Sequence, residues 1–283
     1  CEAGAMMNAD LIIRDALQSW RALLRRPGYL VLVSLTLALG IGTTAVVTAI
    51  LDQTVFRELP FPNADKLVTL GASSGEGTTY GSPGLYNKAR ELQTLESTGL
   101  VQAYTRNVNA VVDGEPRVLK ALGADRGFLD TLGLLPVLGR NFLKSEDTRN
   151  GVDAVIISND LWRRYFGAAK DIVGRSIVIE GREVAIVGVL SPAFVWPETF
   201  DLITPLRSDP TSNSLSINEF IVGRLAAPQS RSQLVAELET RFRAYLAQLG
   251  ASRGGRASTR QMEFTAIDLK DGIFVSRSGN VPW

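Results

Sequence analysis

The feature that most constrains this chain is an apolar run from Tyr29 to Phe56, YLVLVSLTLALGIGTTAVVTAILDQTVF, in which Asp52 is the first charged residue. A helix needs about 20 apolar residues to cross the hydrocarbon core of a bilayer. The alternatives are a buried helix of a globular domain, which is usually shorter and more amphipathic, and a cleaved signal peptide, whose apolar region spans about 7–15 residues. We predict a retained transmembrane helix at residues 28–57.

Small side chains form one stripe along this predicted helix. Their positions repeat at helical spacing: Ser34, Ala38, Gly42, Ala45 and Ala49. Small residues let a second backbone approach closely, which favours packing between membrane helices, although Gly and Ala are also common in such helices generally. No second apolar run of comparable length follows Phe56. The packing partner is therefore expected in another chain, or in a longer form of this protein.

Residues 8–27 are predicted to form a basic amphipathic helix that lies at the membrane surface. Apolar residues recur on one face and arginines on the other, and Arg26-Pro27-Gly28 then breaks the helix. We assign four membrane-interface residues: Trp20, Arg21, Arg25 and Arg26. The positive-inside rule places this end in the cytoplasm and the large following domain outside it, at the cell inner membrane. A lipid-modified Cys1 would conflict with that orientation.

The composition excludes several function classes. The chain of 283 residues has 30 Lys and Arg against 29 Asp and Glu, so we expect no nucleic-acid partner. It contains no His, which excludes imidazole-based catalysis. Cys1 is its single cysteine, which excludes an internal disulfide. No phosphate-binding loop of the Walker type occurs, so an ATP-driven role would need a separate ATPase. We predict no catalytic residue, no metal and no cofactor.

The region after the predicted membrane helix mixes strands with helices, which is typical of an α+β fold. Two hairpins are expected, with turns at Asp113-Gly114 and Gly181-Arg182. Predicted strands are 66–70, 100–104, 108–112, 116–124, 154–158, 176–180, 183–190, 220–225 and 262–267. Predicted helices are 82–95 with Ser82 as N-cap, 128–132, a helix capped by Asn159, and 230–249.

We predict an extracytoplasmic domain at 58–270, in two lobes. Residues from about 96 to 210 would form an inserted lobe of strands and hairpins, and 66–95 would pair with 211–270 as a smaller lobe. Residues 271–283 would be a tail that leads to a second, missing membrane helix.

Three stretches resemble MacB-type ABC transporter permeases, in the order expected for that family. The first is ALQSWRALLRRPGYLVLVSLTLALGIGTTAVVTAILDQTVFRELPFPNADKLV; the others are GFLDTLGLLPVLGRNF and AVIISNDLWRRYFGAAKDIVGRSIVIEGREVAIVGVLSPAFVWP. The resemblance extends from about Leu11 to Pro205. Its motif residues are interpreted as structural: Gly133, Pro136, Gly139, Arg140, Trp162, Phe166, Gly167, Gly174, Gly188, Pro192, Phe194 and Pro197.

The resemblance implies a two-lobed periplasmic core domain between the first and second of four membrane helices. It also implies a dimer of permease copies in the lipid bilayer, a separate cytoplasmic ATPase, and mechanotransmission to substrate or to a periplasmic adaptor. The sequence departs from the family by stopping at Trp283. It is therefore expected to be the amino-terminal part of a permease.

Two other hypotheses remain open from the sequence. The chain could be a free-standing single-pass protein with an extracytoplasmic binding or adaptor domain. The other hypothesis is an extracytoplasmic Ser/Lys hydrolase, because the chain contains Ser73, Ser74, Ser158 and Lys170. No nucleophile and base occur at a recognisable spacing, which disfavours this hypothesis.

Overall fold

The computed structural model describes residues 27–51, 59–73, 79–216, 218–252 and 263–275. The chain divides into two compact units, Cys1–Arg57 and Glu58–Trp283, which are treated separately below. The predicted interfacial helix at residues 8–27 lies outside the described residues apart from Pro27, and so do the interface residues Trp20, Arg21, Arg25 and Arg26.

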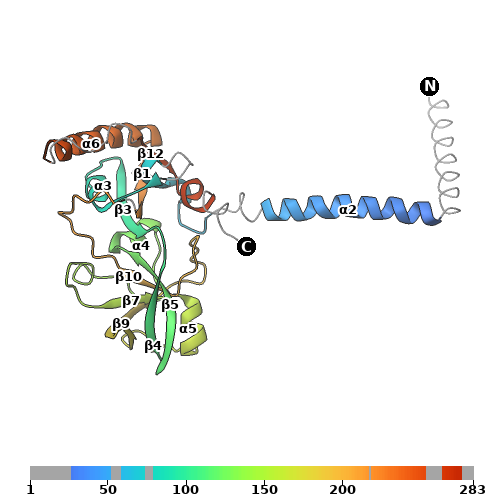
Figure 1. Ribbon diagram of the computed structural model, residues 1–283, viewed down its shortest axis with the longest axis horizontal. Coiled ribbons are helices and arrows are strands. Elements are labelled where there is room, and N and C mark those ends of the chain that lie inside the picture. Colours follow the sequence, from blue (N-terminus) through green and yellow to red (C-terminus); the bar gives the residue numbers. More distant parts are fainter. Residues whose placement is uncertain (1–26, 52–58, 74–78, 217, 253–262, 276–283) are drawn as a thin grey trace. The chain divides into compact units, whose positions relative to one another are not determined.

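The first unit contains one described helix, α2 (Pro27–Leu51), which carries no charged side chain (Figure 1). The large apolar side chains that the structure describes on this helix are exposed, with Leu35 57% and Ile41 68% accessible. Ser34, Ala38 and Gly42 of the small-residue stripe are also exposed, and the helix includes Ala45 and Ala49. A search of the described residues found no helix that meets the length and hydropathy expected of a membrane span.

The second unit is built on one mixed sheet, and helices connect some of its described strands (Figure 1). The strands are β1 (Leu67–Ser73), β2 (Thr79–Tyr80), β3 (Leu95–Gln102), β4 (Arg106–Val112), β5 (Glu115–Ala124), β6 (Leu138–Gly139), β7 (Ala154–Ile157), β8 (Ser176–Ile179), β9 (Arg182–Val189), β10 (Leu202–Pro205), β11 (Glu219–Leu225) and β12 (Phe264–Asp268). The helices are η2 (Ala64–Lys66), α3 (Pro83–Ala89), α4 (Arg126–Leu132), α5 (Asn159–Phe166), α6 (Arg231–Ser252) and η4 (Lys270–Val275).

Six of these strands close into a ring. Antiparallel pairs join β5 to β4, β4 to β8 and β8 to β9; β9 pairs parallel with β7, and β7 pairs antiparallel with β10. The parallel pairing of β10 with β5, from Leu202↔Ala121 to Pro205↔Ala124, completes the circuit. α5 covers one part of this ring, with Leu161 buried in its apolar cluster.

The four remaining long strands form an antiparallel extension in the order β3-β11-β1-β12. β3 belongs to this extension through seven pairs with β11, and meets the ring at Val101↔Ala124. Helices α3 and α6 bury their apolar faces in one cluster with these strands. The α6 residues predicted to face the core are all buried there: Leu234, Leu238, Phe242, Leu246 and Leu249.

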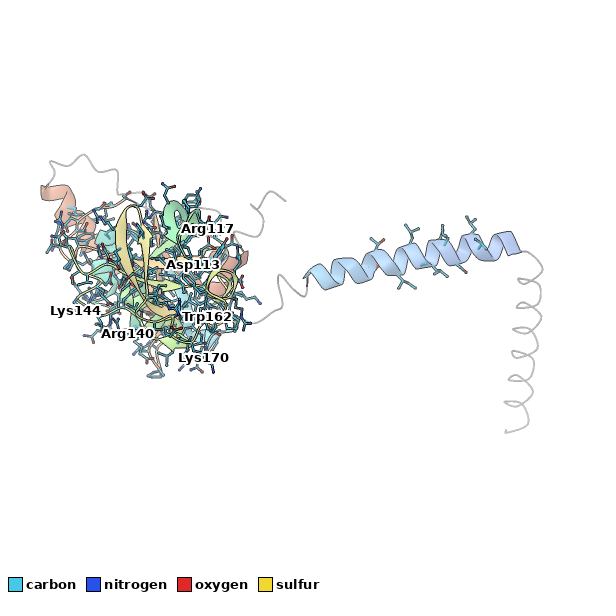
Figure 2. The ribbon with its side chains drawn as sticks, turned by 90° about the horizontal axis from the view of Figure 1, so that it is seen from below. Asp113, Arg117, Arg140, Lys144, Trp162 and Lys170 are labelled. Atoms are coloured by element: carbon cyan, nitrogen blue, oxygen red, sulfur yellow. The ribbon has the colours of Figure 1, made fainter. Side chains whose placement is uncertain are left out.

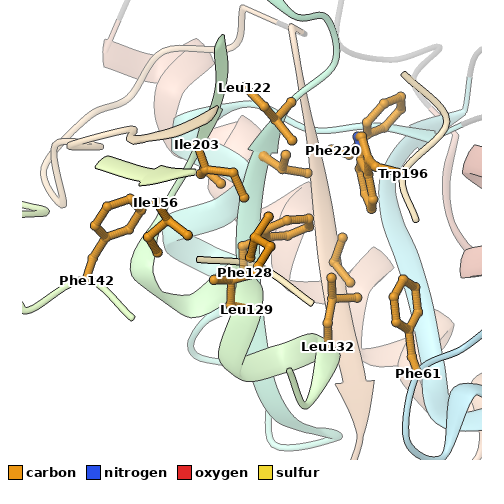
Figure 3. Packing of buried hydrophobic residues seen from close by; sticks show 14 of the residues in the cluster. Phe61, Leu122, Phe128, Leu129, Leu132, Phe142, Ile156, Trp196, Ile203 and Phe220 are labelled. Atoms are coloured by element: carbon orange, nitrogen blue, oxygen red, sulfur yellow. The ribbon is translucent and has the colours of Figure 1, made fainter. Parts of the chain in front are cut away.

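A central apolar cluster joins the ring to this extension (Figure 3). Phe128 of α4 lies at its centre and packs edge-on against Trp196, with ring centroids 5.0 Å apart. Helix α4 approaches β3 so closely that a Cβ at Gly99 would lie 2.4 Å from the Phe128 Cα. Ile273 of η4 is also fully buried in this cluster, so the start of the predicted tail at 271–283 is part of the core.

The predicted α+β class describes this mixed fold well. Both hairpins form, but the second turn is Glu180-Gly181 and not Gly181-Arg182. Glu180 and Gly181 both have positive φ, 49° and 77°, and a two-residue turn of this kind favours glycine at its second position. The lobe limits at 96 and 210 and the domain limits at 58 and 270 stay predictions.

Two predicted helix boundaries are wrong. The helix expected at 82–95 ends at Ala89, since the Glu237 carboxylate accepts the N–H groups of Gln93 and Thr94, at 3.1 and 3.2 Å, and holds them in an extended path into β3. The N-cap of α5 is Ser158 and not Asn159, because the Ser158 hydroxyl accepts the Leu161 N–H at 3.1 Å. The predicted Ser82 cap of α3 is confirmed.

Candidate functional site

A cleft of the second unit lies beside α4 and has a volume of about 700 Å³. Its walls come from α3, β3, the start of α4, the loop after β6 and the segment after β10. Four basic side chains line it, Arg90, Arg126, Lys144 and Arg149, together with three acidic ones, Asp125, Asp130 and Asp147.

Asp125 occupies the buried end of this cleft, between β5 and α4. Its backbone N–H donates to the Leu100 carbonyl, and its carboxylate accepts the Leu100 N–H, both at 2.8 Å. The Tyr86 hydroxyl donates to the second carboxylate oxygen. Burial raises the pKa of Asp125 to about 7 and, together with the adjacent Asp125, raises the pKa of the Tyr86 hydroxyl.

Asp147 joins two walls of the cleft. One of its carboxylate oxygens accepts the Arg126 N–H at 2.7 Å, and the other accepts the Arg207 N–H at 2.9 Å. Burial raises the pKa of Asp147. Arg207, at φ 53°, is held in this left-handed conformation by further bonds to the Glu146 carbonyl and to Asp153. These contacts fix the loop that carries Lys144 and Arg149.

The family-motif residue Arg140 anchors the same loop. Its guanidinium forms a bidentate pair with Glu146, at 2.8 and 2.7 Å, and this pair lowers the pKa of that carboxyl. Gly139 pairs with Gly188 across β6 and β9, where a Cβ on Gly188 would lie 2.6 Å from the Arg140 carbonyl oxygen. Pro136 is also in contact range of that site, at 3.2 Å.

The remaining motif residues lie at turns and core edges. Gly133 and Gly167 end α4 and α5 with positive φ, and Gly174 has φ 90°. Trp162 is labelled in Figure 2, and its indole donates to the Ala169 carbonyl at 2.9 Å. Trp162 and Phe166 pack on the apolar cluster of the ring. The last three follow β9: Pro192 is exposed, Phe194 packs against Phe200 with centroids 5.6 Å apart, and Pro197 is half-buried.

Arg224 ties the entry of the second unit to α4. It is 8% exposed, and its Nε donates to the Thr131 carbonyl at 3.0 Å. Its Nη1 donates to the carbonyls of Pro62 and Asn63, at 3.0 and 3.3 Å. The sequence did not indicate this contact, because Arg224 stands within an apolar strand and its partners are backbone groups far away in the chain.

The sequence prediction named none of the cleft residues either. Asp125 precedes α4 like an ordinary N-cap, whereas its side chain bonds β3 and Tyr86, 25 and 39 residues away. In the part of the chain that the structure describes, no group of three or more acidic, His or Cys residues is placed to hold a metal ion. Ser73 and Ser158 do not line this cleft, and the absence of catalysis stays a prediction.

The comparisons with known proteins identify the family. The family model for the MacB-like periplasmic core domain matches residues 30–241, and the chain therefore belongs to that family. A search of curated proteins gave no match. The mixed α/β unit is thus a MacB-like extracytoplasmic domain of the ABC-type permease family.

Solved structures agree on the fold. The periplasmic region of MacB from Actinobacillus actinomycetemcomitans is similar with a TM-score of 0.50 and 14% identity, over 78% of this chain and 95% of that one. A domain of a protein assigned as a permease, from Porphyromonas gingivalis, is similar with a TM-score of 0.52 and 18% identity, over 75% of this chain and 94% of that one. At these identities the likeness shows the fold alone.

The raised pKa of Asp125 gives a testable pH dependence. Between its ordinary value of 3.8 and about 7, the folded protein holds a proton that the unfolded chain has released, so stability falls as pH rises through this window. Asp125→Asn mimics the protonated acid, since its amide can accept from Leu100 and donate to Tyr86. We expect the variant to be more stable than the parent at pH 8 by on the order of 2 kcal/mol.

Thermal unfolding of the full chain from pH 4 to pH 8 measures this effect. The unfolding temperature of the Asp125→Asn variant should depend less on pH than that of the parent. The control variant Asp160→Asn, on the exposed side of α5, should show the same pH dependence as the parent. If the stability of the parent and of the Asp125→Asn variant changed with pH in the same way, the raised pKa of Asp125 would be contradicted.

Proposed function

We propose that this chain is part of a permease subunit of a MacB-like ABC system, in which the extracytoplasmic domain relays ATP-driven helix motion to a substrate or periplasmic partner. The match of residues 30–241 to the MacB-like periplasmic core domain carries this proposal. In it the chain is not an enzyme; a separate cytoplasmic ATPase supplies the chemical energy. A second permease copy and a periplasmic adaptor are the other protein partners.

In this proposal α2 crosses the cell membrane, with the amino end in the cytoplasm. The support comes from its 25 uncharged residues and from the exposure of its large apolar side chains. Two of its hydroxyls are satisfied inside the helix, as hydrocarbon requires: Thr43 donates to the Leu39 carbonyl at 2.6 Å and Thr44 to the Gly40 carbonyl at 2.8 Å. The exposed small residues Ser34, Ala38 and Gly42 would face a neighbouring helix.

The contacts of Arg224 suggest how motion would enter the domain. They join Pro62 and Asn63, just after the segment that leaves α2, to the end of α4 and to β11. Because Phe128 of α4 lies in the central cluster, displacement of the entry segment would pass into the core that joins the ring to the strand extension. The domain would then respond as a connected body.

Cysteine labelling in spheroplasts tests the membrane arrangement. In a Cys1→Ser background, Asn150→Cys places a thiol on the exposed surface of the second unit, and Ser19→Cys places one before α2. We expect a membrane-impermeant maleimide to label the first in intact spheroplasts and the second only after permeabilisation. Equal labelling of both thiols in intact spheroplasts, or the reverse order, would contradict the proposed topology.

A further inference from the structure

The cleft beside α4 is lined by three cations that form no ion pair with a described carboxylate. Arg90, Arg126 and Lys144 line it, and none of them forms an ion pair among the described residues. Arg149 is 3.8 Å from Asp209, at the limit of a weak, exposed pair. Guanidinium and ammonium groups are donors only, so these side chains require acceptors from a ligand or from water.

The aspartates of the cleft form no ion pair with these cations, and each accepts hydrogen bonds from other protein donors. Asp147 accepts two backbone N–H groups, and Asp130 accepts the Asn141 side-chain amide at 2.9 Å. Asp125 accepts the Leu100 N–H and the Tyr86 hydroxyl. Burial also raises the pKa of Asp125 to about 7, which reduces the negative charge that this group carries at neutral pH. The cleft therefore presents net positive charge.

A buried hydroxyl adds one more donor. Ser208, in the wall after β10, has a side-chain oxygen that is shielded from solvent and makes no hydrogen bond in the structure. A buried polar atom without a partner is costly, and such a group at a cleft is satisfied when a ligand arrives. Arg207, next to Ser208, is fixed by four hydrogen bonds, so the position of this wall is well defined.

We propose that this cleft binds a small, multiply charged oxyanion, with phosphate or carboxylate oxygens facing Arg90, Arg126, Lys144 and Ser208. The volume of about 700 Å³ lies in the range of small-molecule sites. The loop that carries Lys144 is held by the Arg140–Glu146 pair and by Asp147, so the backbone at Lys144 is in position before the ligand arrives. This binding does not depend on an ATPase partner, and its test is separate from that of the proposed function.

Equilibrium dialysis of the full chain in nonionic detergent tests the site, with radiolabelled inorganic phosphate and radiolabelled citrate as probes at constant ionic strength in chloride. We expect saturable binding of one anion per chain. Arg126→Gln and Lys144→Gln should each weaken binding about 10-fold or more, because each removes charge-assisted hydrogen bonds. Ser208→Ala should weaken it by about 3-fold or more, and Lys170→Gln, outside the cleft, should leave it unchanged.

Absence of saturable binding for both probes would overturn the proposal. Equal weakening by Lys170→Gln and Lys144→Gln would also overturn it, because general charge attraction would then explain the binding. Thermal unfolding identifies any variant that fails to fold. In the described structure, the side chains of Lys144 and Ser208 make no hydrogen bond to the backbone. The variants Lys144→Gln and Ser208→Ala therefore decide the result if Arg126→Gln is unstable.

Discussion

Replacing Phe128 with alanine is expected to lower the free energy of unfolding by about 4 kcal/mol. The side chain is 0% exposed and lies in the cluster that joins the ring to the strand extension. It packs edge-on against Trp196 and lies 6.5 Å, centroid to centroid, from Phe194. Because the Phe128 backbone sits against Gly99, helix α4 is held in place on that side and cannot move to fill the cavity.

Thermal unfolding of the full chain in nonionic detergent, followed by tryptophan fluorescence, measures this loss. For a unit of this size we expect the midpoint to fall by roughly 10 °C. Leu135→Ala is the matched control: Leu135 follows α4 but is 80% exposed, and its truncation should change stability by less than about 0.5 kcal/mol. If Phe128→Ala behaved like Leu135→Ala, the central cluster would not hold the unit together.

Arg224→Ala is expected to cost about 3 kcal/mol. The substitution removes bonds from the guanidinium to the carbonyls of Thr131, Pro62 and Asn63 and leaves a cavity in their place. The Thr131 bond is buried, so loss of this donor leaves its carbonyl unsatisfied, whereas the exposed Asn63 carbonyl still accepts the Lys66 N–H at 3.0 Å. Arg224→Lys should recover part of the loss, because one ammonium keeps the charge but cannot reach the separate carbonyls as a planar fork does.

The same unfolding measurement tests this prediction, with Arg163→Ala on the exposed face of α5 as the control. Limited proteolysis adds a local readout, since loss of the Pro62 and Asn63 contacts should open the entry segment to cleavage before the rest of the unit. An Arg224→Ala protein with unchanged stability and unchanged cleavage would remove Arg224 from the proposed path of motion.

The sequence predicted the turns and helices that are specified by residues close together in the chain. Asp113-Gly114 specifies its hairpin because both residues take positive φ, 53° and 79°, which a two-residue turn needs. The long helix α6 follows from apolar residues at helical spacing, and all five predicted core positions are buried. Four glycines of the motif segments have positive φ in the structure: Gly133, Gly139, Gly167 and Gly174. The interpretation of the motif residues as purely structural stays a prediction.

Long-range features were not predictable in this way. The parallel pairing of β10 with β5 joins residues about 80 positions apart, and no local pattern marks it. Glu237 ends the α3 segment from a helix more than 140 residues further on. The cleft is likewise assembled from five separated parts of the chain, and the polar residues of each part carry no signal of a site by themselves. Charge counts over the whole chain hide the local excess of cations there.

The most direct test of the central claim is co-purification of the complete gene product, in detergent, with ATPases from the same cell. We predict that one cytoplasmic ATPase is retained and that its turnover depends on the presence of this permease. Arg224→Ala should weaken that dependence while the ATPase still binds. A clean preparation with no associated ATPase, from cells that express the parent protein stably, would contradict the permease assignment and leave the outer domain as a binding module.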